Sequence, residues 1–293
     1  GGNAYKLYGS VVPAVDDFLY LGVPINSKGV DFHNHVAKCA TKARQALSFL
    51  TSMGLRTTRL RTKVKTRLYK TFVRPCLEYA IQLLPHWQNL LKMLESVQVE
   101  ALRSIFAVAQ NTATDALYAL TGLTPMSSRA SELHVTWLLK SQRKSEEYAV
   151  SHLTPPVATK STMKRKPPQD LWELCKDAPL KEIIELRREW AASQTPTPAE
   201  RFGNLPNPDE LEIAEKVLGE PRKRRKLHLW LLRKTYGKPS RCRNCGEGST
   251  TELHVQQCTS IDIDTMVSNK SWTSVDMAID RALDIIPPSY RPP

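Results

Sequence analysis

The sequence lacks the features of membrane and secreted proteins. Its 293 residues contain no hydrophobic run near the roughly 18 apolar residues that a helix needs to cross a bilayer. The first residues do not pair a charged start with an apolar stretch, as a secretory signal does. Six cysteines are too few and too scattered for a secreted disulfide scaffold. We therefore expect a protein of the reducing cytosol or nucleus with no membrane partner.

Catalytic motifs are also missing. The chain has no G-x-x-x-x-G-K-[ST] phosphate loop, no G-x-S-x-G nucleophile turn and no H-E-x-x-H metal motif. Asp16 and Asp17 are the one carboxylate pair that suggests a two-metal polymerase site, but Ala14 stands where such a site has an aromatic residue. His33 and His35 fit capping and packing at a helix start. We predict that the chain is not an enzyme.

Acidic residues are outnumbered, with 29 Asp and Glu against 42 Lys and Arg, and the net charge is +13. Residues 56–74, the first basic segment, contain eight basic residues and no acidic one. On a regular helix, an apolar arc adjoins the basic arc and is predicted to be buried; it consists of Leu60, Val64, Leu68 and Phe72. Like charges on one face cost stability unless an anion neutralises them. We therefore predict phosphate contacts for Arg56, Arg59, Lys63, Arg67, Lys70 and Arg74.

Residues 222–226 form the second basic segment, and further basic residues follow it with no acidic residue before Gly246. A nuclear import signal has the same composition, which does not exclude phosphate binding. If half of the 18 charges in both stretches met phosphates, the log–log salt slope on duplex DNA would be about −8. The predicted contacts here are Arg222, Lys223, Arg224, Arg225 and Lys226.

The cysteines and the histidine near the C-terminus are spaced C-x2-C-x8-H-x3-C. Two thiolates three positions apart can face one metal from a tight turn, and ligands four positions apart share one face of a helix. Thiolate and imidazole in tetrahedral number select zinc and leave no open position for water. We predict one structural Zn²⁺ held by Cys242, Cys245, His254 and Cys258. The neighbouring Arg241 and Arg243 are predicted to contact nucleic acid.

Hydrophobic periodicity predicts a mostly α fold. We expect a β segment at 1–30, a helical bundle at 31–150, a Pro-rich linker with one helix at 151–208, a basic helix and zinc module at 209–260, and an amphipathic helix at 261–293. One helix carries a regular apolar stripe, formed by Leu90, Leu94, Val97, Ala101, Ile105 and Val108.

The order of these segments resembles the C-terminal part of non-LTR (LINE-like) retrotransposon reverse transcriptases. Phe18–Val23 is similar to the strand that ends the palm, and residues 37–54, 69–80, 94–108 and 123–129 are similar to the helical thumb. The Cys3His spacing is similar to the C-terminal zinc knuckle of that family. The resemblance implies a part that grips a template–primer duplex, because the fingers and the catalytic palm are not in this chain.

The sequence thus predicts a nuclear, non-catalytic protein that binds DNA or RNA through the phosphate backbone, as a domesticated derivative of a reverse transcriptase. Two alternatives stay open. The chain is a scaffold subunit of a nuclear complex, with a protein partner on the N-terminal strand or the C-terminal helix at 271–286, or it is the C-terminal fragment of an active reverse transcriptase.

Overall fold

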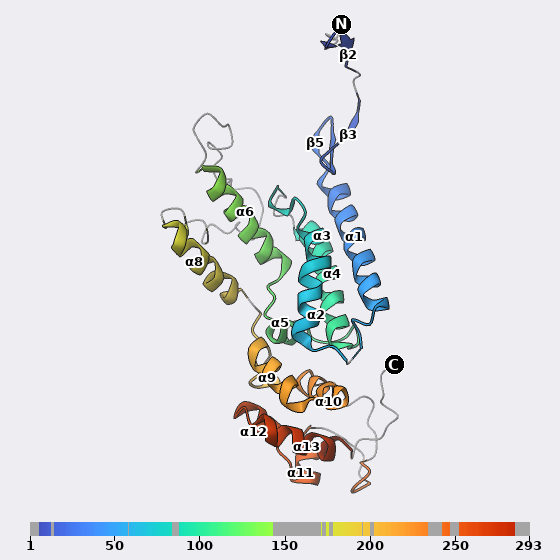
Figure 1. The fold of residues 1–293 in the computed structure, drawn as a ribbon, viewed down its shortest axis with the longest axis vertical. Helices are drawn as coiled ribbons and strands as arrows, with labels where there is room; N and C mark the ends of the chain where they lie inside the picture. Colours follow the sequence, from blue (N-terminus) through green and yellow to red (C-terminus); the bar gives the residue numbers. More distant parts are fainter. Residues whose placement is uncertain are drawn as a thin grey trace.

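The fold is mostly helical, as predicted (Figure 1). The computed structural model describes residues 6–12, 15–57, 59–83, 88–142, 171, 174–175, 178–194, 196–199, 202–233, 242–246 and 252–284. The Pro-rich linker predicted around 151–170 and Arg241 lie outside the described residues. No helix in the described part of the chain is long and apolar enough to cross a membrane.

The predicted N-terminal β segment consists of five short strands among its described residues. The strands are β1 (Lys6–Leu7), β2 (Ser10–Val11), β3 (Asp17–Tyr20), β4 (Val23–Asn26) and β5 (Gly29–Val30). β1 pairs with β2, and an antiparallel sheet has the order β3-β4-β5. The predicted strand is a hairpin because Leu21 and Gly22 both have positive φ, of 48° and 82°, and turn the chain back on itself. Figure 1 shows this sheet beyond the N-terminal end of α1.

The bundle contains long and short helices. They are α1 (Phe32–Ser52), α2 (Thr62–Leu68), the π-helical turn η1 (Tyr69–Val73), α3 (Arg74–Glu78), the 3₁₀ turn η2 (Ile81–Leu83), α4 (Gln88–Phe106), α5 (Thr114–Thr121) and α6 (Met126–Gln142). The predicted stripe on α4 is confirmed, because its members are all buried. The side chain of Asp31 caps α1 by accepting a hydrogen bond from the Asn34 amide.

The first basic segment does not form the regular helix that was predicted. α2 begins only at Thr62, and η1 shifts the later residues around the helix axis because a π turn is wider than an α turn. The predicted buried face is wrong at three of its four positions, since Leu60, Val64 and Phe72 are 38%, 45% and 53% exposed. Leu68 is half-buried and packs against the core. The structure instead buries Thr62, Lys65, Thr66, Tyr69 and Val73.

The C-terminal helices stack on one end of the bundle (Figure 1). They are α9 (Pro208–Leu218), α10 (Pro221–Leu231), α11 (Glu252–Thr259), α12 (Ile263–Ser268) and α13 (Trp272–Asp284). Asn207 begins α9 with a capping box, in which its side chain accepts from the Glu210 amide while the Glu210 carboxylate accepts from the Asn207 amide. α8 (Leu180–Ser193) lies beside α6 and shares a small separate core with it, in which Val135 and Ile183 are buried.

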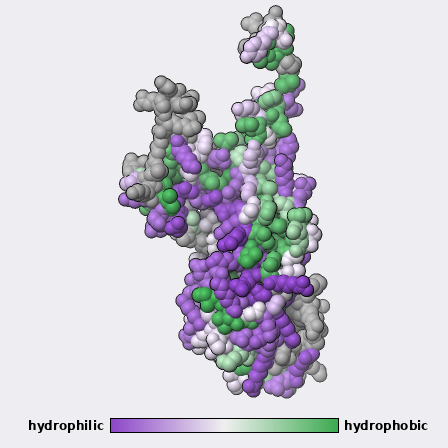
Figure 2. Space-filling model, in the orientation of Figure 1, coloured by the Kyte–Doolittle hydropathy of each residue, from purple (hydrophilic) through white to green (hydrophobic). Residues whose placement is uncertain are grey.

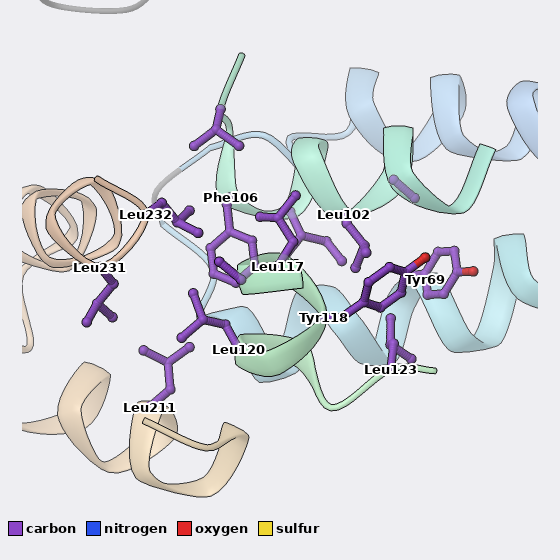
Figure 3. Packing of buried hydrophobic residues seen from close by; sticks show 14 of the residues in the cluster. Tyr69, Leu102, Phe106, Leu117, Tyr118, Leu120, Leu123, Leu211, Leu231 and Leu232 are labelled. Carbon is purple, nitrogen blue, oxygen red and sulfur yellow. The ribbon is translucent and has the colours of Figure 1, made fainter. Parts of the chain in front are cut away.

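One hydrophobic core runs from the bundle into the C-terminal helices. Figure 3 shows Leu211 of α9 and Leu231 of α10 beside Leu120 and Phe106 of the bundle. The apolar face of α13 joins this core, since Val275 and other members of that face are fully buried. The scaffold alternative placed a partner on this helix, but its apolar face is already covered within the chain.

Candidate metal centre and basic surface

Two pairs of ligands meet in the C-terminal region. Cys242 and Cys245 lie on a tight turn in which the Gly246 amide donates to the Cys242 carbonyl at 2.9 Å. His254 and Cys258 lie four positions apart on α11, and therefore on one face of it. The two cysteine Sγ atoms of residues 242 and 258 are 3.7 Å apart, and Cys245 Sγ is 3.4 Å from His254 Nε2. All four ligand atoms lie within 4.8 Å of one another.

The surroundings of the turn favour thiolate over thiol. Burial raises the pKa of Cys242, but hydrogen bonds from the Cys245 amide, His254, the Asn244 amide and Cys258 outweigh it and lower the pKa to about 6. The Asn244 side-chain amide also lies 3.2 Å from Cys258 Sγ. Thiolate is the form that binds metals, so these hydrogen bonds favour the metal-binding form of Cys242.

The donor set fits one metal ion. A tetrahedral ion with metal–sulfur distances of about 2.3 Å holds two thiolates about 3.8 Å apart, and the observed Sγ–Sγ distance is 3.7 Å. The cluster could hold one metal ion, and Cys3His ligation is compatible with zinc. In the described part of the chain, no other group of three or more potential ligands comes together, and Asp16 and Asp17 belong to no such group.

The first basic segment places four of its six predicted contacts at the surface. Arg56 and Arg59 lie in the loop before α2, Arg67 lies on α2 and Lys70 lies on η1; all four are exposed. Among the described residues, no carboxylate forms an ion pair with any of them. All four charges lie at the surface without a counter-ion among the described residues, and partial burial together with Arg74 and Arg129 lowers the pKa of Lys70.

The other two predicted contacts of this segment are engaged within the chain. Lys63 Nζ lies 2.5 Å from a Glu212 carboxylate oxygen and 3.4 Å from Asp209, both on α9. Arg74 Nε lies 2.5 Å from Glu78, one helical turn further on. Glu78 also accepts from Arg129 of α6, so this pair belongs to a network that joins α3 to α6.

The second basic segment lies in the N-terminal half of α10, and most of its side chains are engaged within the chain. Lys223 Nζ lies 2.9 Å from Asp276 of α13, and Lys226 Nζ lies 2.6 Å from Asp280 of the same helix. Arg224 is only 6% exposed and donates to the Arg59 carbonyl at 3.2 Å.

The remaining members of the second segment differ in exposure, since Arg225 is half-buried and Arg222 is exposed. Arg225 donates to the Ala107 carbonyl at 3.4 Å, and Arg222 is exposed at the start of the helix. At the metal site, Arg243 is exposed on the turn between the two cysteines. The predicted contacts from 222 to 226 thus share their helix with packing interactions, whereas Arg243 lies on the surface.

A buried polar clamp between the bundle and the C-terminal helices was not predicted. The Glu215 carboxylate on α9 accepts from the Thr62 amide at 2.9 Å and from His228 Nε2 at 2.7 Å. Burial raises the pKa of Glu215, but the hydrogen bonds from His228 and Thr62 outweigh it and hold the pKa below its usual value. Glu215 lies 13 residues from His228 and 153 from Thr62, so no local spacing signals this contact.

Comparison with known proteins gives no match: no family model, no curated protein and no solved structure is significantly similar to this chain.

Proposed function

We propose that this protein binds nucleic acid through the first basic segment and does not catalyse a reaction. The observation that carries this proposal is the set of four exposed cations, Arg56, Arg59, Arg67 and Lys70, which no carboxylate of the described chain neutralises. The phosphate backbone is a regular array of the missing counter-charges, and basic side chains that meet it release condensed cations. Such contacts position a protein without reading sequence, so base preference is modest.

Exposed apolar side chains beside these cations support the same proposal. The exposed Val64 and Phe72 lie on α2 and η1, on either side of Arg67 and Lys70 in the sequence. Phe49 of α1 is 64% exposed. Figure 2 shows hydrophobic surface over the C-terminal half of α1, next to a band of hydrophilic surface. Surfaces that hold nucleic acid often combine cations with aromatic rings on which bases stack.

We also propose that the metal is zinc and that it is structural. Four protein ligands fill a tetrahedral site, so the ion would contribute folding free energy rather than an activated water. Cys242 and Cys245 would hold it from the turn, and His254 and Cys258 from α11. Arg243 on that turn would then be fixed beside the site and add a backbone contact. A nuclear location and descent from a reverse transcriptase complete the proposal, and they rest on the order of the sequence motifs.

Charge reversal tests the proposal. The variant Arg59→Glu/Arg67→Glu/Lys70→Glu should bind a labelled duplex at least a hundredfold more weakly, with a salt slope about 2 to 3 shallower, because each lost phosphate contact removes about 0.9 from the slope. The control Lys28→Glu/Lys42→Glu/Lys92→Glu changes the net charge equally at exposed positions of other elements. Equal loss in both variants would reduce the effect to net charge and contradict the proposal.

One observation favours a scaffold function as the second candidate. β3 lies at an edge of its sheet, and the hydrophobic residues Phe18, Leu19, Tyr20 and Leu21 are each more than half exposed. An open, apolar edge strand is a template for pairing with another chain. If Phe18→Ser/Tyr20→Ser abolishes assembly with a partner while duplex affinity is unchanged, and the charge reversal leaves function intact, the scaffold function replaces the proposal above.

A further inference from the structure

A small cavity between α2, the end of α4, α9 and α10 is lined by more positive than negative charge. Its charged walls are Lys65, Arg224, Arg225 and Glu215, and its apolar walls include Leu60 and Phe106. The volume open to the centre of a water molecule is about 10 Å³, which is what one water or one oxyanion oxygen requires. The cavity therefore has room for one oxygen atom beside three cations.

The cations of this cavity are largely withdrawn from water. Lys65 is 3% exposed and Arg224 is 6% exposed. Among the described residues, no carboxylate forms an ion pair with Lys65, Arg224 or Arg225, and the buried Arg224 Nε has no hydrogen-bond partner. A buried charge without a partner and a buried donor without an acceptor both destabilise the fold.

The chain offsets this charge only in part. Lys65 Nζ donates to the Ile105 carbonyl at 2.8 Å and Arg225 donates to the Ala107 carbonyl, both at the C-terminal end of α4. A helix C-terminus supplies about half a negative charge. The Glu215 carboxylate is already bound by Thr62 and His228. Together these groups offset fewer charges than the three cations carry.

Two further observations agree with a missing anion. Burial, followed by the charges of Arg225 and Arg224, lowers the pKa of Lys65 to about 8, although the charge of Glu215 acts in the opposite direction. Burial and then the charge of Arg56 lower the pKa of Arg225, which places the exposed Arg56 near this cavity. Both shifts mark cations that repel one another in a poorly solvated place.

We infer that this cavity is an oxyanion site, in which one oxygen of a phosphate group enters between Lys65, Arg224 and Arg225 while the rest of the phosphate lies at the mouth. Phosphate is the class of ligand because it is tetrahedral, charged at neutral pH and able to accept from the Arg224 Nε, Lys65 and Arg225 donors together. In nucleic acid the group is a phosphodiester, so this inference rests in part on the proposed function. Free phosphate offers the same chemistry.

The experiment titrates the zinc-loaded full chain with inorganic phosphate by calorimetry, with sodium chloride of equal ionic strength as the reference. Wild type should bind phosphate and melt at a higher temperature in it than in chloride, because a ligand of the folded state alone stabilises that state. Lys65→Met and Arg225→Gln, checked for folding by circular dichroism, should bind at least tenfold more weakly. Lys42→Gln, at an exposed position on α1, should bind as wild type does. Equal affinity in all four proteins overturns the inference.

A second arm, with a labelled duplex, separates the two sources of phosphate. If the phosphodiester is the ligand, Lys65→Met and Arg225→Gln each bind the duplex about tenfold more weakly, with a salt slope about 1 shallower. If both variants lose free phosphate but keep duplex affinity, the site serves a free oxyanion. Wild type that binds phosphate and no duplex keeps the site and overturns the proposed function. Wild type that binds the duplex and no phosphate overturns only the site.

Discussion

Both basic segments lack acidic residues, but their surroundings differ. In residues 56–74, four predicted contacts are exposed and have no carboxylate partner among the described residues. In residues 222–226, Lys223 and Lys226 pair with two aspartates of α13, and Arg224 is buried against the loop before α2. One segment presents its charge to solvent, while much of the other holds helices together.

This difference shows that uniform charge in the sequence does not identify a binding surface. The acidic partners of the second segment are Asp276 and Asp280, about 50 residues further along the chain and one helical turn apart. That spacing matches Lys223 and Lys226 and is the one signal in the sequence that could have predicted the pairing. For the first segment, α9 supplies acids to Lys63 alone, through Asp209 and Glu212.

Metal removal should give the largest effect, and the effect should be confined to the C-terminal helices around the metal site. Chelation, or Cys242→Ser, is expected to cost the C-terminal module most of its folding free energy, on the order of 10 kcal/mol for a site of this kind. Zinc stoichiometry and hydrogen exchange measure the result. Loss of protection should begin in α11, while α1 and α4 stay protected. Uniform loss, or a chain without bound zinc that keeps α11 protected, would contradict a structural metal.

The second-largest effect is expected at the buried polar clamp between the bundle and the C-terminal helices. Glu215→Gln is expected to destabilise the fold by about 3–5 kcal/mol, because it leaves His228 and the nearby cations without their buried carboxylate. The folded pKa of Glu215 lies below its usual 4.5, so its stabilisation is present above about pH 4.5 and is lost as pH falls through the folded pKa. Urea unfolding at several pH values should show a shallower acid loss in the variant. An unchanged acid profile would argue against the clamp.

Lys65 gives a smaller effect: its buried charge destabilises the fold, whereas the charge of Glu215 stabilises it, and stability rises with pH in both cases. Its folded pKa is about 8, below the usual 10.5, so the unfolded chain binds more protons between these values and stability rises with pH there. In phosphate-free buffer, wild type should gain about 2 kcal/mol relative to Lys65→Met between pH 7.5 and pH 10. Denaturant unfolding of both proteins measures the difference. A constant difference across that range would show that the lysine is solvated.

The smallest expected effect lies in the second segment itself. Lys223→Gln/Lys226→Gln removes two partly exposed ion pairs, and pairs of this kind contribute little to stability because solvent screens them. Melting temperature should fall by a few degrees at most, and duplex affinity should change less than threefold. The matched variant Arg59→Gln/Arg67→Gln should show the reverse, with unchanged melting and clearly weaker binding. Equal binding losses in the two variants would remove the distinction between the segments.

Much of the helical architecture could be predicted because periodic apolar faces are local signals. The stripe on α4 and the helix near 209–218 are confirmed within a residue or two. The N-terminal strand was misread as continuous because Leu21 adopts positive φ, which non-glycine residues rarely do. The face of α2 was also misread, since the π turn and the buried Lys65 depend on contacts with α4 that are distant in sequence.

The metal site and the basic surface also differ in how far local sequence spacing predicts them. The four metal ligands lie on one turn and one short helix, so their spacing fixes most of the geometry, and the structure brings all four together. The basic surface depends on which acids the tertiary fold delivers to each cation. Asp276 and Asp280 reach α10 only because α13 packs on it, and Glu212 reaches Lys63 only because α9 packs beside α2.

Nucleic-acid binding through the first basic segment is tested by titration of the zinc-loaded chain against labelled duplex DNA, an RNA–DNA hybrid and single strands at two salt concentrations. Four exposed cations and Arg243 predict salt-sensitive binding, strongest for duplex or hybrid, with a log–log slope near −4.5. A slope near −8 would show that the second segment also meets phosphates. Binding weaker than millimolar at low salt would contradict the nucleic-acid function itself.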